Sequence, residues 1–258
     1  MSRAVVRSPY SIDYGDALRL GFIVPSGNVI AEPQIRAMLP AGVLPLFTRL
    51  ALRGSSEAEL MRMMEGVEAA AELLADARVD RIVFHCTAVT TFSPQSGPEI
   101  RRRIEAKTGI PGMVTSDALA AAFAGLGWRR LVLLSPYIAS VHQREITFVE
   151  QLGLSVVRDA FLDIDTNDEM ARLSPEALRD WVLNHRDAQA DGYFLSCTAL
   201  RTAELIAPLE AELGHPVLTS NQVMVWHALR SAGMSQPIPG WGELLEQVLD
   251  LRSVRRLP

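Results

Sequence analysis

Two cysteines stand in matching surroundings, and they are the residues best suited to covalent or proton-transfer chemistry. Residues 82–91 read IVFHCTAVTT and residues 193–202 read YFLSCTALRT, so Cys86 and Cys197 each follow a short apolar run and precede Thr-Ala. A thiol in such a place can attack carbon as a thiolate, or can donate and accept a proton. A single cysteine at the end of a buried run is usually a small hydrophobic residue. Recurrence within matched motifs favours a pair of reactive thiols.

The expected environment of both thiols favours their ionised form. Each cysteine is predicted to end a strand and to precede a helix, where unpaired backbone N–H groups and the helix dipole lower the pKa of a thiol below about 8.5. The turns that follow, Thr87-Ala88 and Thr198-Ala199, offer hydroxyl and amide donors suited to a substrate carboxylate. Two related halves would place the two thiols on opposite sides of one small acid.

Three further polar residues are candidates for substrate binding. Asn28 follows Pro25-Ser26-Gly27 in a turn that is expected to leave its amide free to donate, although a plain turn residue is an equally good interpretation. Tyr137 holds the matching place in the second half, where its phenol can donate to a carboxylate or an enolate oxygen. Asn167, within DIDTNDEM, reads from its local sequence as an N-cap or loop residue.

Internal repeats divide the chain into two halves. Beside the cysteine motifs, GIPGMVTSDAL (109–119) matches GHPVLTSNQVM (214–224), and LGFIVPSGN (20–28) matches RLVLLSPY (130–137) in the same order. We therefore predict an N-terminal extension over 1–17, a first α/β lobe over 18–126, a second over 127–232, and a C-terminal helix or tail over 233–258. The helical-looking segment 242–251 can pack on the core or on a partner subunit, and we expect a homo-oligomer.

Each half alternates short apolar runs with helical periods. Residues 81–85 and 192–196 are typical of buried parallel strands. Capping boxes are predicted at Ser56/Glu59, ahead of a Met-rich apolar stripe, and at Ser96/Glu99, while Ser174 is predicted to cap a third helix. A βαβα order implies a parallel sheet with helices on both faces. The predicted fold is α/β, with two pseudosymmetric doubly wound parallel-sheet lobes and the active site between them.

Composition and charge exclude several classes of function. The chain has 48% hydrophobic and 21% charged residues and a net charge of −5, which argues against a nucleic-acid partner. No apolar run reaches the roughly 18 residues needed to span a bilayer, and no secretory signal is recognisable, so we predict a cytoplasmic protein without a membrane partner. The Arg101–Arg103 cluster reads as a solvated helix face.

The sequence contains no recognisable motif for binding a metal ion or a dinucleotide cofactor. The five histidines lack metal-ligand spacing, and no G-x-G-x-x-G follows a strand. Strand alternation points His85 and Cys86 to opposite faces, which disfavours a Cys–His dyad. We therefore expect neither a metal site nor a cofactor.

Five motifs resemble maleate cis-trans isomerase and its relatives in the aspartate/glutamate racemase superfamily. These are VPSGNVIAEPQI (24–35), CTA (86–88), SPY (135–137), DTN (165–167) and CTALRT (197–202), in the family's order. The resemblance implies a cofactor-independent enzyme in which the first cysteine adds to an alkene carbon, the second supplies a proton, and Asn, Tyr and Asn bind the carboxylates. Those roles correspond to Cys86, Cys197, Asn28, Tyr137 and Asn167. The related arylmalonate decarboxylases keep only the second cysteine.

The favoured hypothesis is therefore a two-cysteine isomerase that acts on a small carboxylic acid of the maleate type through a covalent Cys86 adduct. One alternative is a racemase or epimerase of an amino acid or its derivative, including one in ectoine degradation, with the same thiols as an acid/base pair. Arylmalonate-type decarboxylation is a weaker alternative, and a small-acid binding protein built of two lobes is the non-enzymatic one. The first motif reads PSGN where the isomerases have PSSN, so the sequence leaves the acid itself open.

Overall fold

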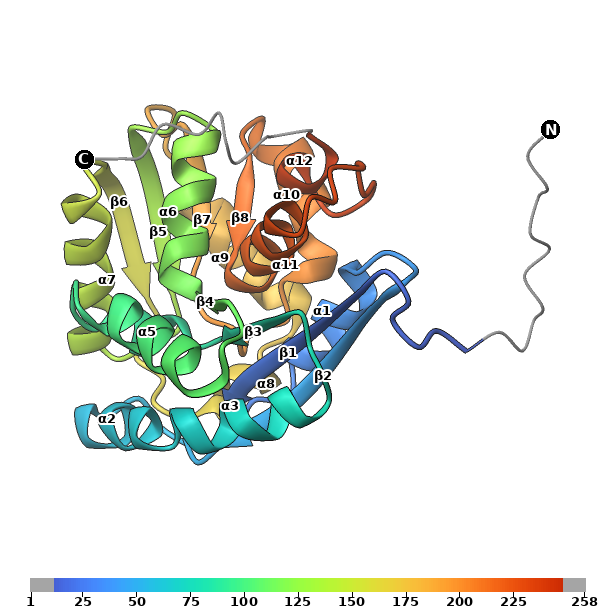
Figure 1. Ribbon diagram of the computed structural model, residues 1–258. Helices are drawn as coiled ribbons and strands as arrows, with labels where there is room; N and C mark the ends of the chain where they lie inside the picture. Colours follow the sequence, from blue (N-terminus) through green and yellow to red (C-terminus); the bar gives the residue numbers. More distant parts are fainter. Residues whose placement is uncertain (1–11, 248–258) are drawn as a thin grey trace, which may run out of the picture.

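Two parallel sheets form the frame of the described part of the chain, residues 12–247 of the computed structural model (Figure 1). The first sheet has the strand order β2-β1-β3-β4 and consists of β1 (Leu18–Pro25), β2 (Val43–Leu50), β3 (Arg81–Phe84) and β4 (Gly112–Val114). The helices of this half are α1 (Ala31–Met38), α2 (Glu57–Glu65), α3 (Val67–Asp76), α4 (Thr87–Thr90), α5 (Ser96–Thr108) and α6 (Thr115–Gly125). Every strand pair is parallel, because a helical crossover connects each pair of successive strands.

The second sheet repeats this arrangement with the order β6-β5-β7-β8. Its strands are β5 (Arg130–Ser135), β6 (Ser155–Phe161), β7 (Gly192–Leu195) and β8 (Val217–Thr219). Its helices are α7 (Ala139–Gln151), α8 (Asn167–Arg172), α9 (Pro175–Asn184), the 3-10 helix η1 (Ala203–Leu205), α10 (Ile206–Leu213), α11 (Ser220–Ser231) and α12 (Glu243–Glu246). The two sheets confirm the predicted α/β fold of two similar lobes.

The strand order explains where the cysteines lie. β3 and β7 hold the same inner place in their sheets, and each cysteine follows its strand after one intervening residue. The carboxyl ends of parallel strands meet at one edge of a sheet, which is where open α/β sheets bind ligands. The repeat in the sequence therefore places both thiols at equivalent sheet edges.

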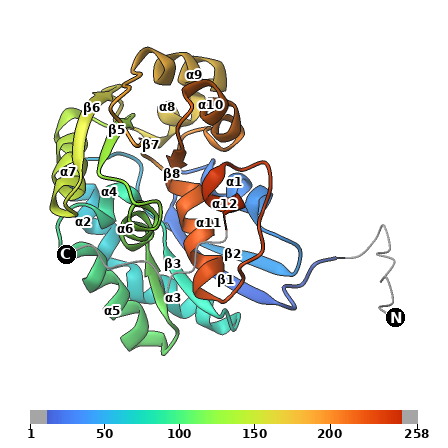
Figure 2. The same cartoon turned by 90° about the horizontal axis from the view of Figure 1, so that it is seen from above.

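The two lobes share their hydrophobic core. Helices α6 and α11 pack against each other and lie between the two sheets in the view from above (Figure 2). Phe123 of α6 stacks on Trp128 with 5.5 Å between ring centroids, and it meets Phe194 of β7 edge-on at 5.7 Å. A helix that follows the first sheet thus packs on a strand of the second. The lobe boundary near residue 126 remains a prediction.

The Met-rich apolar stripe is core, as predicted, but two helices carry it. Leu60 and Leu74 are buried and Met64 is half-buried, whereas the helix breaks between α2 and α3 at Gly66. A Cβ atom at Gly66 would lie 2.6 Å from Cδ2 of Leu50, so any larger residue at this bend would require the Leu50 side chain to shift.

The two predicted capping boxes are wrong in their hydrogen bonds. Ser56 does stand at the N-cap of α2, but its hydroxyl lies 3.4 Å from the Glu59 carboxylate instead of capping a backbone N–H group. Ser96 is the first residue inside α5 and pairs with the hydroxyl of Ser93 at 2.9 Å. In both places a neighbouring side chain competes for the hydroxyl. The predicted cap at Ser174 is confirmed by the bond that it accepts from the Ala177 N–H.

The C-terminal segment packs on the core as far as it is described. Leu244 and Leu245 of α12 are fully buried, while the part of the predicted 242–251 helix beyond residue 247 lies outside the described residues. Of the predicted extension over 1–17, only residues 12–17 are described. The three side chains of the Arg101–Arg103 cluster pair with Asp117, Glu99 and Glu68, and their exposures of 41%, 67% and 20% confirm a solvated helix face for Arg101 and Arg102 but not for Arg103.

Candidate active site

Cys86 is the N-cap residue of the short helix α4 and is 5% exposed. The backbone N–H groups of Ala88 and Val89 hydrogen-bond to its sulfur and favour the thiolate, as the sequence predicted. Burial opposes them and is the larger effect, and it raises the pKa of the Cys86 thiol to about 12. The expectation of a lowered pKa is therefore wrong for this structure, because desolvation outweighs the amide donors.

Cys197 follows β7 in a strained backbone conformation, with φ of +100°. Its sulfur accepts a hydrogen bond from the Ala199 N–H at 3.2 Å and lies 3.6 Å from the sulfur of Met170. The Tyr137 hydroxyl also hydrogen-bonds to it, yet burial again raises the pKa of the thiol to about 12. The predicted helix does not follow at once: the chain turns through residues 198–202 before η1 begins at Ala203.

The two thiols belong to one buried cluster at the junction of the lobes. Cys86, Tyr137 and Cys197 are members of the same hydrophobic core. A negative charge on Cys197 raises the pKa of Cys86, and charge on either sulfur raises the pKa of Tyr137 above its usual value. The structure thus brings these three predicted site residues together. At neutral pH all three hold their protons.

The strain at Cys197 gives a test of the backbone geometry. We expect Cys197→Gly to be more stable than Cys197→Ala by about 1 kcal/mol, because glycine adopts a positive φ without a Cβ clash. Urea unfolding of both variants measures the difference. The matched control is Cys86, where φ is −151° and alanine should be the more stable replacement. Equal stabilities of the two Cys197 variants would contradict the strained conformation.

Asn28 joins the two lobes. Its Oδ1 accepts hydrogen bonds from the N–H groups of Ile30 and Ala31, both at 2.9 Å, which is the turn role considered from the sequence. Its Nδ2 donates to Thr198 Oγ1 at 2.8 Å across 170 residues of chain. The turn therefore leaves the Nδ2 amide free to donate, as expected, and the neighbouring lobe supplies its acceptor. Substrate oxygen would have to replace Thr198 as the partner of this amide.

Asn167 is the first residue of α8, next to the N-cap Thr166, and lies near the loop that leaves β2. Its N–H donates to the carbonyl of Arg53 at 3.1 Å and its Nδ2 lies 3.5 Å from the carbonyl of Leu52. In the same loop, Ser55 donates from both its N–H and its hydroxyl to Asp165. The DTN motif of the second lobe thus holds a loop of the first.

Sequence reasoning missed Ser220, which connects the two cysteine turns. Its hydroxyl oxygen accepts from Thr87 Oγ1 at 2.9 Å and from the N–H of Cys197 at 3.1 Å. Thr87 and Ala88, like Thr198 and Ala199, are buried beside their cysteines. The repeated Thr-Ser of the 109–119 and 214–224 segments was the signal that could have found Ser220.

His85 takes part in a separate buried network, in agreement with the prediction that it forms no dyad with Cys86. Burial lowers the pKa of His85 to about 4, so the ring is neutral. Its Nε2 lies 2.8 Å from Oδ1 of Asn221, whose Nδ2 donates to Gln34. Gln34 in turn donates to the carbonyl of Leu200. This network fixes the Cys197 turn against α1 of the first lobe.

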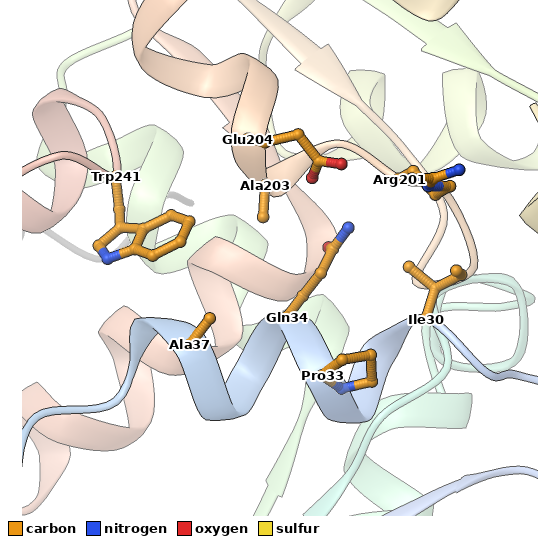
Figure 3. A pocket seen from close by; sticks show the side chains of 8 residues that line it. All are labelled: Ile30, Pro33, Gln34, Ala37, Arg201, Ala203, Glu204 and Trp241. Atoms are coloured by element: carbon orange, nitrogen blue, oxygen red, sulfur yellow. The ribbon is translucent and has the colours of Figure 1, made fainter. Parts of the chain in front are cut away.

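A cavity of about 270 Å³ lies on the outer side of this network (Figure 3). Side chains of α1 form its floor, and those of Arg201, Ala203, Glu204 and Trp241 surround it. Neither cysteine lines it, so it is distinct from the thiol cluster. Within residues 12–247 no group of three or more His, Cys, Asp or Glu side chains is arranged to hold a metal ion. No helix in the same range is long and apolar enough to cross a membrane.

Comparison with known proteins identifies the family of this chain. The sequence profile of the family described as arylmalonate decarboxylase matches residues 20–245. The chain belongs to this family. This agrees with the resemblance that the five motifs indicated.

The relatives of this chain include isomerases as well as decarboxylases. It is 28% identical over 242 residues to the maleate isomerase of Geobacillus stearothermophilus, covering 88% of this chain and 96% of that protein. It is 33% identical over 143 residues to the arylmalonate decarboxylase of Bordetella bronchiseptica, covering 54% of this chain and 60% of that protein. The chain is thus an enzyme, with isomerase relatives over nearly its whole length.

A solved structure shares the fold. The Nocardia farcinica maleate cis-trans isomerase, as a cysteine-to-serine variant with a covalently bound succinylcysteine intermediate, superposes with a TM-score of 0.84. The two are 22% identical, and the match covers 89% of this chain and 98% of that chain.

Proposed function

We propose that this enzyme isomerises a small cis-dicarboxylate of the maleate type, with Cys86 as the nucleophile and Cys197 as the proton donor. The observation that carries the proposal is the pair of buried thiols at equivalent strand ends, close enough that the charge of one raises the pKa of the other. The maleate isomerase relatives and the succinylcysteine of the Nocardia structure support covalent cysteine chemistry.

Both thiols are protonated in the resting protein, so the cycle starts when Cys86 loses its proton to solvent and becomes a thiolate beside the Cys197 thiol. Cys86 Sγ forms a bond to one alkene carbon, the π bond breaks, and negative charge moves onto the adjacent carboxylate as an enediolate. The Cys197 thiol then protonates the other carbon, which leaves a single bond that rotates. Cys197 takes a proton back, the C–S bond breaks, and the trans acid leaves with both sulfurs in their starting states.

The surroundings of the two thiols suit these roles. Burial keeps Cys197 protonated at neutral pH, as a proton donor requires. The Ala88 and Val89 amides stabilise the Cys86 thiolate once it forms. Tyr137 donates toward Cys197 and is placed to donate to substrate oxygen beside it. Each well-placed donor of this kind is commonly worth about 3 kcal/mol in the transition state.

Racemisation or epimerisation is the second candidate, and the similar surroundings of the two thiols favour it. Burial raises both pKa values to about 12, so neither cysteine is marked as the only nucleophile. Two equivalent thiols on opposite faces of a stereocentre can each remove and return a proton.

One experiment separates these reactions and arylmalonate decarboxylation. The enzyme is incubated in deuterium oxide with maleate, aspartate, glutamate, an arylmalonate and ectoine-derived acids, and NMR follows isomerisation, deuterium uptake and CO2 release. Conversion of maleate to fumarate supports the proposal. Exchange of an α-hydrogen without isomerisation supports the racemase, and turnover of none of these acids contradicts both.

Substitution of the carboxylate-binding candidates tests the site. We expect Asn28→Ala and Tyr137→Phe each to lower kcat/KM some ten- to hundredfold, because a hydrogen bond to a charged group is worth about 1.5–3 kcal/mol. Asn28→Ala should also lower stability, since it leaves the buried partners of both amide atoms unpaired. Tyr193→Phe is the matched control: this buried tyrosine bonds to Asp187 and should leave kcat/KM unchanged. Unchanged kinetics in both site variants would assign Asn28 and Tyr137 a purely structural role.

A further inference from the structure

Glu145 is a buried acidic side chain that the proposed mechanism leaves without a role. It lies on α7, the helix that follows Tyr137, and is 1% exposed. Its Oε1 accepts a hydrogen bond from Ser196 Oγ at 2.7 Å, and Ser196 is the residue directly before Cys197. Its Oε2 has no hydrogen-bond partner among residues 12–247. A buried carboxyl oxygen without a hydrogen-bond partner destabilises the folded state, so its presence calls for an explanation.

The basic side chains closest to Glu145 in the sequence have other partners. On the same helix, Arg144 pairs with Glu57 and lies over the ring of Phe92. His142 lies between Ser135 at the end of β5 and Asp159 of β6. Burial without a paired cation therefore raises the pKa of Glu145 to about 8, although its bond from Ser196 works in the other direction. At neutral pH the side chain is the uncharged acid.

The remaining titratable groups that face Glu145 are those of the candidate site. A negative charge on Glu145 raises the pKa of Cys86, of Cys197 and of Tyr137. An ionised Glu145 therefore opposes the thiolate that starts the cycle and the thiolate that Cys197 becomes after it gives up its proton. The acid form opposes neither thiolate, and both forms accept the hydrogen bond from Ser196.

We propose that Glu145 is a positioning residue that holds the Cys197 turn through Ser196 and that hinders thiolate formation when it ionises. This inference rests on the proposed two-thiol function for its kinetic consequences. Glu145 does not touch the substrate or exchange a proton with it. Its two effects are the placement of Cys197 and the electrostatic potential at both sulfurs.

Isosteric and apolar replacements separate these effects. Glutamine keeps the volume and the acceptor for Ser196 but cannot ionise, whereas leucine keeps the volume and loses the acceptor. We expect Glu145→Leu to lower kcat for maleate about tenfold, the typical loss for one buried hydrogen bond, and Glu145→Gln to recover most of that activity. Glu150→Gln, on an exposed position of the same helix, is the matched control. Wild-type activity in Glu145→Leu would overturn the positioning role.

The pH dependence tests the electrostatic effect. Since ionisation of Glu145 opposes the thiolates, the activity ratio of Glu145→Gln to wild type should rise roughly tenfold between pH 7 and 9.5, as one pKa unit on a thiol corresponds to tenfold in thiolate. Glu150→Gln should keep a constant ratio. A constant ratio for Glu145→Gln as well would overturn the proposal.

A readout without substrate distinguishes failure of this inference from failure of the proposed function. The rate at which iodoacetamide alkylates Cys197 is measured against pH in the Cys86→Ala background, with Glu145 or Gln at position 145 and the product located by peptide mass. The rate ratio should again rise toward pH 9.5. A rising ratio in an enzyme that does not isomerise maleate would reject the function and keep the role of Glu145. A flat ratio would reject that role whatever the substrate.

Discussion

Cys86→Ala is expected to abolish isomerisation of maleate, with a fall in kcat on the order of 10⁴-fold or more, because it removes the only group proposed to form a bond to carbon. The variant should remain folded. Alanine removes the sulfur that the N–H groups of Ala88 and Val89 approach, and we expect this loss to cost only about 1–2 kcal/mol. Progress curves by NMR and urea unfolding measure the two quantities.

Maleate binding to Cys86→Ala shows whether the activity is lost because the nucleophile is missing or because the site is disrupted. Cys86→Ala retains Asn28, Tyr137 and Asn167, so maleate should still raise its melting temperature. Near-native turnover would show that Cys86 is not the nucleophile. If Cys86→Ala does not fold, its loss of activity would be due to lost packing. That result would contradict the assignment of Cys86 as chemically essential but structurally dispensable.

Cys197→Ser is expected to stop the reaction after the first step and to leave maleate attached to Cys86. A serine hydroxyl is a far weaker acid than a thiol, so the carbanionic intermediate loses its efficient proton donor and any adduct that water protonates lacks a base to release it. Intact mass spectrometry after acid quenching should show the protein plus one substrate, and peptide mapping should place the added mass on the peptide with Cys86.

The location of the adduct decides between the remaining mechanisms. Cys86→Ala incubated in the same way is the control and should carry no adduct. An adduct on Cys197 in that control would reverse the two roles while preserving covalent isomerisation. Exchange of the substrate α-hydrogen with solvent and no adduct in either variant would favour the racemase, whose chemistry consists of proton transfer alone.

The fold follows from local sequence to a large extent. The runs predicted as strands over 81–85 and 192–196 are observed as Arg81–Phe84 and Gly192–Leu195, because a buried parallel strand needs only a continuous apolar segment between polar ends. Gly109 ends α5 in the left-handed conformation, with φ of +70°, as its position before Pro111 indicates. Such features depend on a few neighbouring residues, and a single sequence contains them.

Features that depend on the approach of distant segments were not predictable in this way. Thr87 meets Ser220 across 133 residues, and Asn28 meets Thr198 across 170. The raised pKa of each thiol is of the same kind, since the local amides favour ionisation and the surrounding lobes decide the outcome by excluding water.

The burial of both sulfurs has a consequence for the life of the enzyme under oxidative stress. Peroxides react with thiolates that they can reach, and redox-sensing cysteines combine a low pKa with exposure to solvent. Cys86 and Cys197 have the opposite combination in the resting protein, with at most 5% exposure and a raised pKa. Sulfenic acid formation is therefore slow at either position between turnovers. A protein that depends on two reduced thiols is thereby protected by its own packing.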